Sequence, residues 1–117
     1  MFYKVDVADY LTERENVHGV RLAQPLLFAG GRYSLSVQAS KYHYCIPRDT
    51  LPYSEYSHFE VRTNLPRKYL PPEWFDICED NVYSYVPKTD INKLIRKMNI
   101  KYGMIPAIKV PKKKHYV

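Results

Sequence analysis

The strongest pattern of apolar and polar positions lies near the C-terminus, in the segment TDINKLIRKMNIKYG. Its apolar side chains recur at the i, i+3, i+4, i+7 spacing of one helix face. They are Ile91, Leu94, Ile95 and Met98. Thr89 is a suitable N-cap, Asp90 favours the positive end of the helix dipole, and Gly103 suits the position after the last turn. The segment is therefore predicted to form an amphipathic α-helix.

Two earlier segments alternate between apolar and polar residues, as half-buried strands do. In residues 33–40 every second side chain is apolar or aromatic, namely Tyr33, Leu35, Val37 and Ala39. The segment HFEVRT, residues 58–63, places Phe59, Val61 and Thr63 on one face. We predict two strands that pair in antiparallel orientation.

A further short strand is predicted for NVYSYVP, residues 81–87. Strict alternation would place Val82, Ser84 and Val86 on one face. Tyr83 and Tyr85 would then share the opposite face of the strand.

The alternation changes phase after Ser40, where the chain reads KYHYCIP. A bulge or tight turn near residues 40–41 would restore the phase. It would place the more apolar set on the core face, namely Tyr42, Tyr44 and Ile46. His43 and Cys45 would then share the other face of the strand.

Strands that come first and a helix that comes last are typical of an α+β fold. We predict a small antiparallel β-sheet with one C-terminal amphipathic α-helix packed on it. The segment PPEWFDI, with Pro72 in the first helical position, predicts a helical turn, and residues 1–7 could add a strand. Residues 1–103 are expected to form a single α+β domain. Residues 104–117 are expected to form a basic, proline-bounded extension, as an edge strand or an extended arm.

Charge is concentrated at the C-terminal end of the chain. The formal net charge is +6, yet eight of the 18 basic residues and none of the 12 acidic residues lie in residues 91–117. Residues 1–90 keep 10 basic and 12 acidic residues, a charge of −2. Such an asymmetry is typical of proteins that bind negatively charged partners, although many runs of charged residues are simply solvated surface.

The sequence also bears on where the protein acts. The longest apolar run is PLLFAGG, far shorter than a membrane span, so we expect no membrane association. Two cysteines cannot form a disulfide framework, and the first residues lack the apolar run of a signal peptide. These features favour a reducing, cytoplasmic location.

Candidate reactive groups are few. His43 and Cys45 would lie on one strand face, where an imidazole could activate a thiolate, but no orienting group or oxyanion hole is recognisable. A zinc site built from His43, Cys45, His58 and Cys78 would lack the paired ligand spacing of known zinc motifs. We therefore expect no enzymatic activity, no cofactor and no metal, with a Cys/His-dependent activity as an alternative.

The candidate binding residues are basic side chains near the C-terminus and tyrosines of the strand segments. They are Lys93, Arg96, Lys97, Lys101, Lys112, Lys113, Lys114, Tyr42, Tyr44, Tyr83 and Tyr85. Twelve tyrosines in 117 residues supply stiff, amphipathic contact area. Lysines combined with tyrosines also suit charge and stacking contacts with RNA or DNA.

Three segments, YSLSVQASKYHYCIPR, EYSHFEV and NVYSYVPKTDINKLI, cover about a third of the chain and resemble a family of small accessory proteins encoded by bacteriophages and prophages. The resemblance implies action inside a bacterial host, by binding rather than catalysis. Some such proteins block host defence, including CRISPR–Cas effectors. We expect a non-enzymatic protein that binds and inhibits or redirects a host protein or ribonucleoprotein complex. The alternative is a small basic nucleic-acid-binding protein, and a homodimer stays open.

Overall fold

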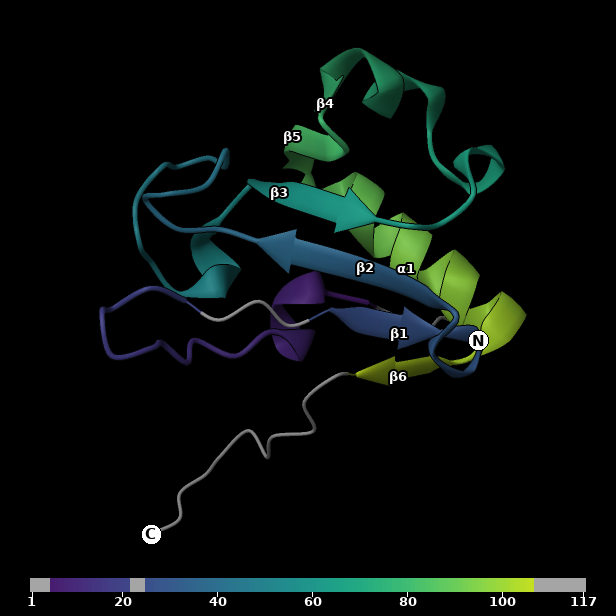
Figure 1. The fold of residues 1–117 in the computed structure, drawn as a ribbon, viewed down its shortest axis with the longest axis horizontal. Coiled ribbons are helices and arrows are strands. Elements are labelled where there is room, and N and C mark those ends of the chain that lie inside the picture. Colours follow the sequence, from purple (N-terminus) through teal and green to yellow (C-terminus); the bar gives the residue numbers. More distant parts are fainter. Residues whose placement is uncertain (1–4, 22–24, 107–117) are drawn as a thin grey trace, which may run out of the picture.

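The structure is a computed structural model that describes residues 5–21 and 25–106. Its strands are β1 (Leu26–Phe28), β2 (Tyr33–Gln38), β3 (His58–Thr63), β4 (Cys78–Glu79), β5 (Val82–Pro87) and β6 (Met104–Pro106). They form one six-stranded sheet in the order β4-β5-β3-β2-β1-β6, and every neighbouring pair is antiparallel. The helix α1 (Lys88–Tyr102) lies along one face of this sheet (Figure 1). The predicted α+β class is confirmed.

Short 3-10 helices connect these elements. They are η1 (Val7–Tyr10), η2 (Ala29–Gly31), η3 (Tyr53–Glu55), η4 (Arg67–Tyr69) and η5 (Pro72–Ile77). The helical turn predicted at PPEWFDI is η5, which begins at Pro72 as expected. The strand considered for residues 1–7 falls partly outside the described residues, and Val7 lies in η1 rather than in a strand.

Helix α1 covers the sheet through the four apolar residues that its periodicity identified, and all four are buried. The predicted N-cap is wrong, because α1 begins at Lys88 with Pro87 in the cap position, which places Thr89 inside the helix. Strand β5 runs directly into α1, and the Lys88 N–H donates to the Ser57 carbonyl at 2.8 Å. A tertiary contact thus satisfies a backbone donor at the start of α1. Gly103 ends the helix with φ of 80°, as predicted.

Strand β5 does not alternate as predicted. Val86 pairs with Phe59 and Tyr83 pairs with Val61, so two residues of β5, Ser84 and Tyr85, lie opposite one residue of β3. This is a β-bulge, and Tyr85 in the bulge has φ of 55°. The bulge brings Tyr83 and Val86 to the core face, where both are buried, and leaves Tyr85 exposed. The predicted shared face for Tyr83 and Tyr85 is therefore wrong.

In the segment after β2, the buried and exposed side chains are also the reverse of those predicted. The strand ends at Gln38, and the His43 N–H donates to the Ser40 carbonyl in a turn. Cys45 is only 1% exposed, whereas Tyr42, Tyr44 and Ile46 are among the most exposed large apolar residues of the described chain. Of the two predicted alternatives, the chain makes the tight turn after Ser40. The predicted burial is wrong, because the turn leaves the tyrosines at the surface and buries Cys45.

The sheet continues beyond Gly103. Strand β6 pairs with β1 along the edge of the sheet, with Leu26 opposite Pro106. The predicted edge strand is confirmed, and the sheet extends three residues past the domain boundary that we expected at residue 103. The rest of the predicted extension, residues 107–117, lies outside the described residues. Within the described ranges, no helix has the length and apolar character to cross a bilayer.

Candidate binding surfaces

Four large apolar side chains emerge around one turn of the chain, and we call them the tyrosine patch. They are Tyr42, Tyr44, Ile46 and Tyr85, with exposed fractions of 59%, 46%, 44% and 41%. Three of them belong to the turn after β2, and the fourth sits in the β5 bulge. Only two other large apolar residues of the described chain, Val17 and Ile100, are comparably exposed. A gathering of this kind is unusual for a surface without a partner.

The patch is held in place by backbone hydrogen bonds. The Tyr44 N–H donates to the buried Glu60 carboxylate of β3 at 3.0 Å. The Tyr44 carbonyl accepts from the Tyr85 N–H at 3.1 Å, and the two ring centroids are 5.9 Å apart. The backbone positions that carry both rings are therefore held by the sheet before any partner binds, which lowers the entropy that binding must overcome.

Tyr85 holds an unfavourable backbone conformation. A positive φ places the Cβ of a non-glycine residue close to its own backbone, at a cost of about 1–2 kcal/mol. The bulge retains this conformation through pairing on both sides and through the bond to Tyr44. Strain of this kind gathers at functional positions, and here it turns an aromatic ring to the surface.

Two basic side chains contact rings of the tyrosine patch. The Lys41 ammonium lies 5.4 Å from the centre of the Tyr42 ring, and the Arg48 guanidinium lies 5.0 Å from the centre of the Tyr44 ring. Both residues are exposed. The patch thus combines exposed aromatic rings with two cations that lie over them, a composition that suits a protein partner with exposed carboxylates.

The two reactive candidates of the turn, His43 and Cys45, are joined through the His43 carbonyl, which accepts from the Cys45 N–H at 3.0 Å and from its thiol at 3.5 Å, and not through the imidazole ring. The His43 ring is hydrogen-bonded to the Ser40 hydroxyl at 2.7 Å. The Cys45 thiol is buried and donates to the Ser40 carbonyl at 3.2 Å, and burial raises its pKa above the ordinary value. A thiol in this setting is a poor nucleophile, because little thiolate forms near neutral pH.

Burial lowers the pKa of the His43 imidazole below its ordinary value. The Glu60 carboxylate opposes this shift. Three guanidinium groups support it, those of Arg21, Arg62 and Arg48. The folded protein therefore favours the neutral imidazole that pairs with Ser40.

This shift predicts acid sensitivity of the turn. As the pH falls through about 6.5, the unfolded chain takes up the His43 proton before the folded protein does. The stabilising contribution is thus present above that pH and is lost as the pH falls towards the lower pKa of the folded state. Urea unfolding at about pH 7.5 and 5.5 should show a smaller acid loss for His43→Gln than for the wild type. Equal losses in the two proteins would contradict this prediction.

A buried arginine fastens the same turn to the following loop. Arg21 is 9% exposed, and its guanidinium donates to the Ala39 carbonyl at 3.0 Å and to the Leu51 carbonyl. It also lies within 3.4 Å of the Tyr56 hydroxyl and 4.4 Å from the centre of the Tyr53 ring. One side chain thus joins the end of β2 to the loop before β3.

A second basic surface lies on α1. Lys93, Arg96, Lys97 and Lys101 are all exposed, as predicted for the polar face of the helix. The structure adds Lys68 of η4, and we call Lys68, Lys93, Lys97 and Lys101 the lysine cluster. Three of its ammonium groups surround the Tyr69 ring, with Lys68 at 5.3 Å and Lys97 and Lys101 at 5.8 Å from its centre.

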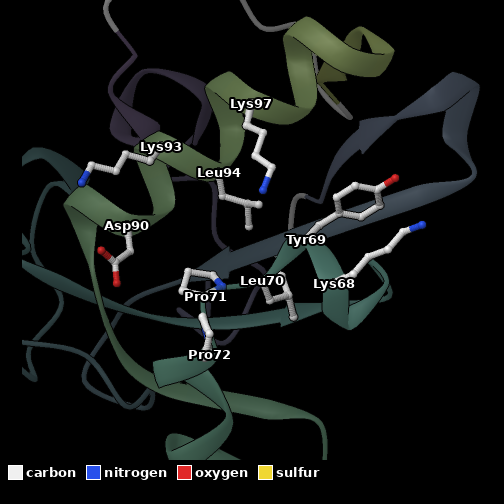
Figure 2. Close-up of a pocket in the computed structure, with 9 residues that line it drawn as sticks. All are labelled: Lys68, Tyr69, Leu70, Pro71, Pro72, Asp90, Lys93, Leu94 and Lys97. Carbon is white, nitrogen blue, oxygen red and sulfur yellow. The ribbon is translucent and has the colours of Figure 1, made fainter.

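A pocket of about 380 Å³ opens between α1 and the segment from Lys68 to Pro72 (Figure 2). Its base is formed by Leu70 and Leu94, which are 5% and 3% exposed. Figure 2 shows the Lys97 side chain reaching from α1 towards Tyr69 across this gap. The pocket therefore has an apolar base and a predominantly cationic wall.

The candidate residues divide between these two surfaces. Tyr42, Tyr44 and Tyr85 lie in the tyrosine patch, but Tyr83 does not, since it is 7% exposed and packs on Trp74 at a centroid distance of 5.6 Å. The prediction of Tyr83 as a contact residue is thus corrected. Lys112, Lys113 and Lys114 lie outside the described residues.

Sequence reasoning missed four residues that shape these surfaces, and they are Arg21, Glu60, Lys68 and Tyr69. The candidate zinc ligands are not brought together, because no three His, Cys, Asp or Glu residues within the described ranges form a group suited to a metal ion.

Comparisons with protein families, with curated proteins and with solved structures find no match to this chain.

Proposed function

We propose that this chain is a non-enzymatic binding protein that docks on a protein of a host macromolecular complex and inhibits or redirects it. The observation that carries the proposal is the tyrosine patch, in which stiff aromatic side chains are exposed together and held by the sheet. Aromatic residues in a preorganised, water-excluding centre supply most of the free energy of protein association.

The cations around the patch favour one type of partner. Lys41 and Arg48 lie over the tyrosine rings, so an apolar site on the partner with carboxylates at its edge would be complementary. The resemblance to phage-encoded accessory proteins supports a bacterial host as the setting. A defence effector, a CRISPR–Cas complex included, is the target that this resemblance favours.

Affinity capture tests the proposal. The immobilised full chain is incubated with nuclease-treated bacterial lysate, alongside Tyr44→Ala and the control Val17→Ser, which removes an exposed apolar side chain from a different turn. We expect the wild type and Val17→Ser to retain the same protein in stoichiometric amount. Tyr44→Ala should lose at least about nine-tenths of it, since a hot-spot tyrosine contributes about 2 kcal/mol.

Two results would contradict the proposal. One is that Tyr44→Ala retains as much of the partner as the wild type does. The other is a wild-type chain that light scattering shows to be a dimer and that Tyr44→Ala converts to a monomer, because the patch would then be occupied by a second copy of the chain.

A further inference from the structure

The lysine cluster is a concentration of positive charge without local neutralisation. Within the described residues, none of its four ammonium groups forms an ion pair with a carboxylate, whereas Lys88 pairs with Asp6 at 3.2 Å. Among the described residues, Asp90 is the one acidic residue that lines the pocket, and its carboxylate accepts a bond from the Trp74 indole at 3.3 Å. Mutual repulsion among such cations is relieved by an anionic ligand.

The size and the apolar base of the pocket suit an organic group better than a bare inorganic anion. Its volume of about 380 Å³ lies within the range of sites for small organic groups, which begins at about 300 Å³. Leu70 and Leu94 form its base, and the Pro71 and Pro72 rings line it beside them (Figure 2). A flat, weakly polar ring could bury against this base while its charged substituent meets the lysines.

The lysines of α1 are spread in a row along the helix instead of being clustered at one position. Lys93, Lys97 and Lys101 are four residues apart, which corresponds to a rise of about 6 Å between neighbours along one side of the helix. A row of this length matches an extended chain with regularly spaced negative charges better than one isolated phosphate.

We propose that this pocket binds one nucleotide unit of a single-stranded nucleic acid. The base lies against Leu70, Leu94 and the two prolines, and successive phosphates lie along Lys93, Lys97 and Lys101. A single strand can turn a base outwards into such a pocket, whereas the bases of a duplex stay paired and stacked. RNA and DNA share this chemistry. The proposal goes beyond the proposed function, since it uses none of the residues of the tyrosine patch.

The chain carries its own reporter of this site. Trp74 is the only tryptophan of the sequence, is 1% exposed and is hydrogen-bonded to Asp90 in the pocket wall. A ligand that enters the pocket should therefore change the tryptophan fluorescence. A ligand held elsewhere on the basic surface should leave it unchanged.

The test measures binding of labelled oligothymidine and oligouridine of about ten nucleotides to the full chain. Lys97→Glu is compared with Lys41→Glu, which changes the net charge equally but lies beside the tyrosine patch. We expect Lys97→Glu to weaken binding at least about tenfold and Lys41→Glu about twofold or less. Lys97→Ala should reduce the slope of log K against log salt by about 0.7, the value for one phosphate contact on a single strand.

Competing ligands decide what the pocket recognises. We expect an oligoglutamate of equal charge, uridine monophosphate and a DNA duplex of equal length all to bind more weakly than the oligonucleotide. Oligoglutamate that binds equally would leave no role for a base, and uridine monophosphate that binds equally would leave no role for a strand. Either result would overturn the proposal, as would equal effects of Lys97→Glu and Lys41→Glu.

The fluorescence measurement and the patch variant separate this proposal from the proposed function. Oligonucleotide binding should change the emission of Trp74 and should be unaffected by Tyr44→Ala. Binding that leaves Trp74 unchanged, or that Tyr44→Ala abolishes, would place the nucleic acid outside the pocket and overturn the assignment. Neither result would bear on whether the tyrosine patch captures a protein.

Discussion

Replacing Arg21 with alanine is expected to lower the free energy of unfolding by about 3 kcal/mol, a large part of the stability of a domain of this size. The change removes the donors to the Ala39 and Leu51 carbonyls and leaves both acceptors without their partner. It also removes the guanidinium from the face of the Tyr53 ring and opens a cavity among buried side chains. Relief from burying a charge offsets part of this loss.

Two further variants test this role of Arg21. Arg21→Lys retains the charge, but a single ammonium cannot fork between Ala39 and Leu51, so a loss of about 2 kcal/mol is expected. Arg14→Ala is the control, since Arg14 is an exposed arginine whose removal should change the stability by about 0.5 kcal/mol or less. Urea unfolding measures all three. A loss for Arg21→Ala no larger than for Arg14→Ala would show that Arg21 does not hold the loop.

Elements that depend on regular periodicity could be predicted from the sequence. The apolar face of α1 has a helical period, and β2 and β3 have a strand period, so the aliphatic residues and Phe59 that these patterns assigned to the core are buried. At these apolar positions the local pattern and the tertiary burial coincide, so they need no knowledge of distant contacts. Glu60 of β3 is the exception, because it is buried although the alternation predicts exposure.

The predictions failed where a long-range backbone contact overrides the local pattern. Thr89 has the chemistry of an N-cap, yet the Ser57 carbonyl meets the helix one residue earlier. In β5 the pairing with β3 requires an extra residue, and the positive φ of Tyr85 reverses the faces that follow. A tyrosine gives no sequence signal of such a conformation, which glycine or asparagine would have suggested.

The candidate surfaces were only partly accessible to sequence reasoning for the same reason. The exposure of the α1 lysines could be predicted from helical spacing. Lys68 and Tyr69 belong to a proline-rich segment distant in sequence, and only the tertiary fold places them beside these lysines. Arg21 was missed because its partners are backbone carbonyls, which every residue possesses. Glu60 lies between Phe59 and Val61, and the alternation of β3 predicts that its side chain is exposed. Its burial results from the turn that packs Tyr44 against it.

Replacing Tyr85 with glycine is expected to weaken binding of the captured protein at least about 30-fold, because a hot-spot tyrosine contributes about 2 kcal/mol or more. The same change should not lower the stability of the fold. Glycine adopts a positive φ without the steric cost that tyrosine bears at this position, and this gain offsets the lost contact with the Tyr44 ring and the greater freedom of the unfolded chain. We expect the free energy of unfolding to stay within about 1 kcal/mol of the wild type.

This variant therefore removes the ring from the surface without weakening the framework. Loss of binding by an unstable variant would be ambiguous, since unfolding alone abolishes most interactions. Tyr85→Gly avoids that ambiguity, and the intact Tyr44 backbone bond to Glu60 keeps the rest of the patch in position.

The dissociation constant of Tyr85→Gly for the captured protein, measured below the unfolding transition beside the wild type, tests the central claim most directly. If the tyrosine patch is the docking surface, the constant should rise at least about 30-fold while the melting temperature is retained. An unchanged dissociation constant for a folded Tyr85→Gly protein would show that the patch does not carry the interaction.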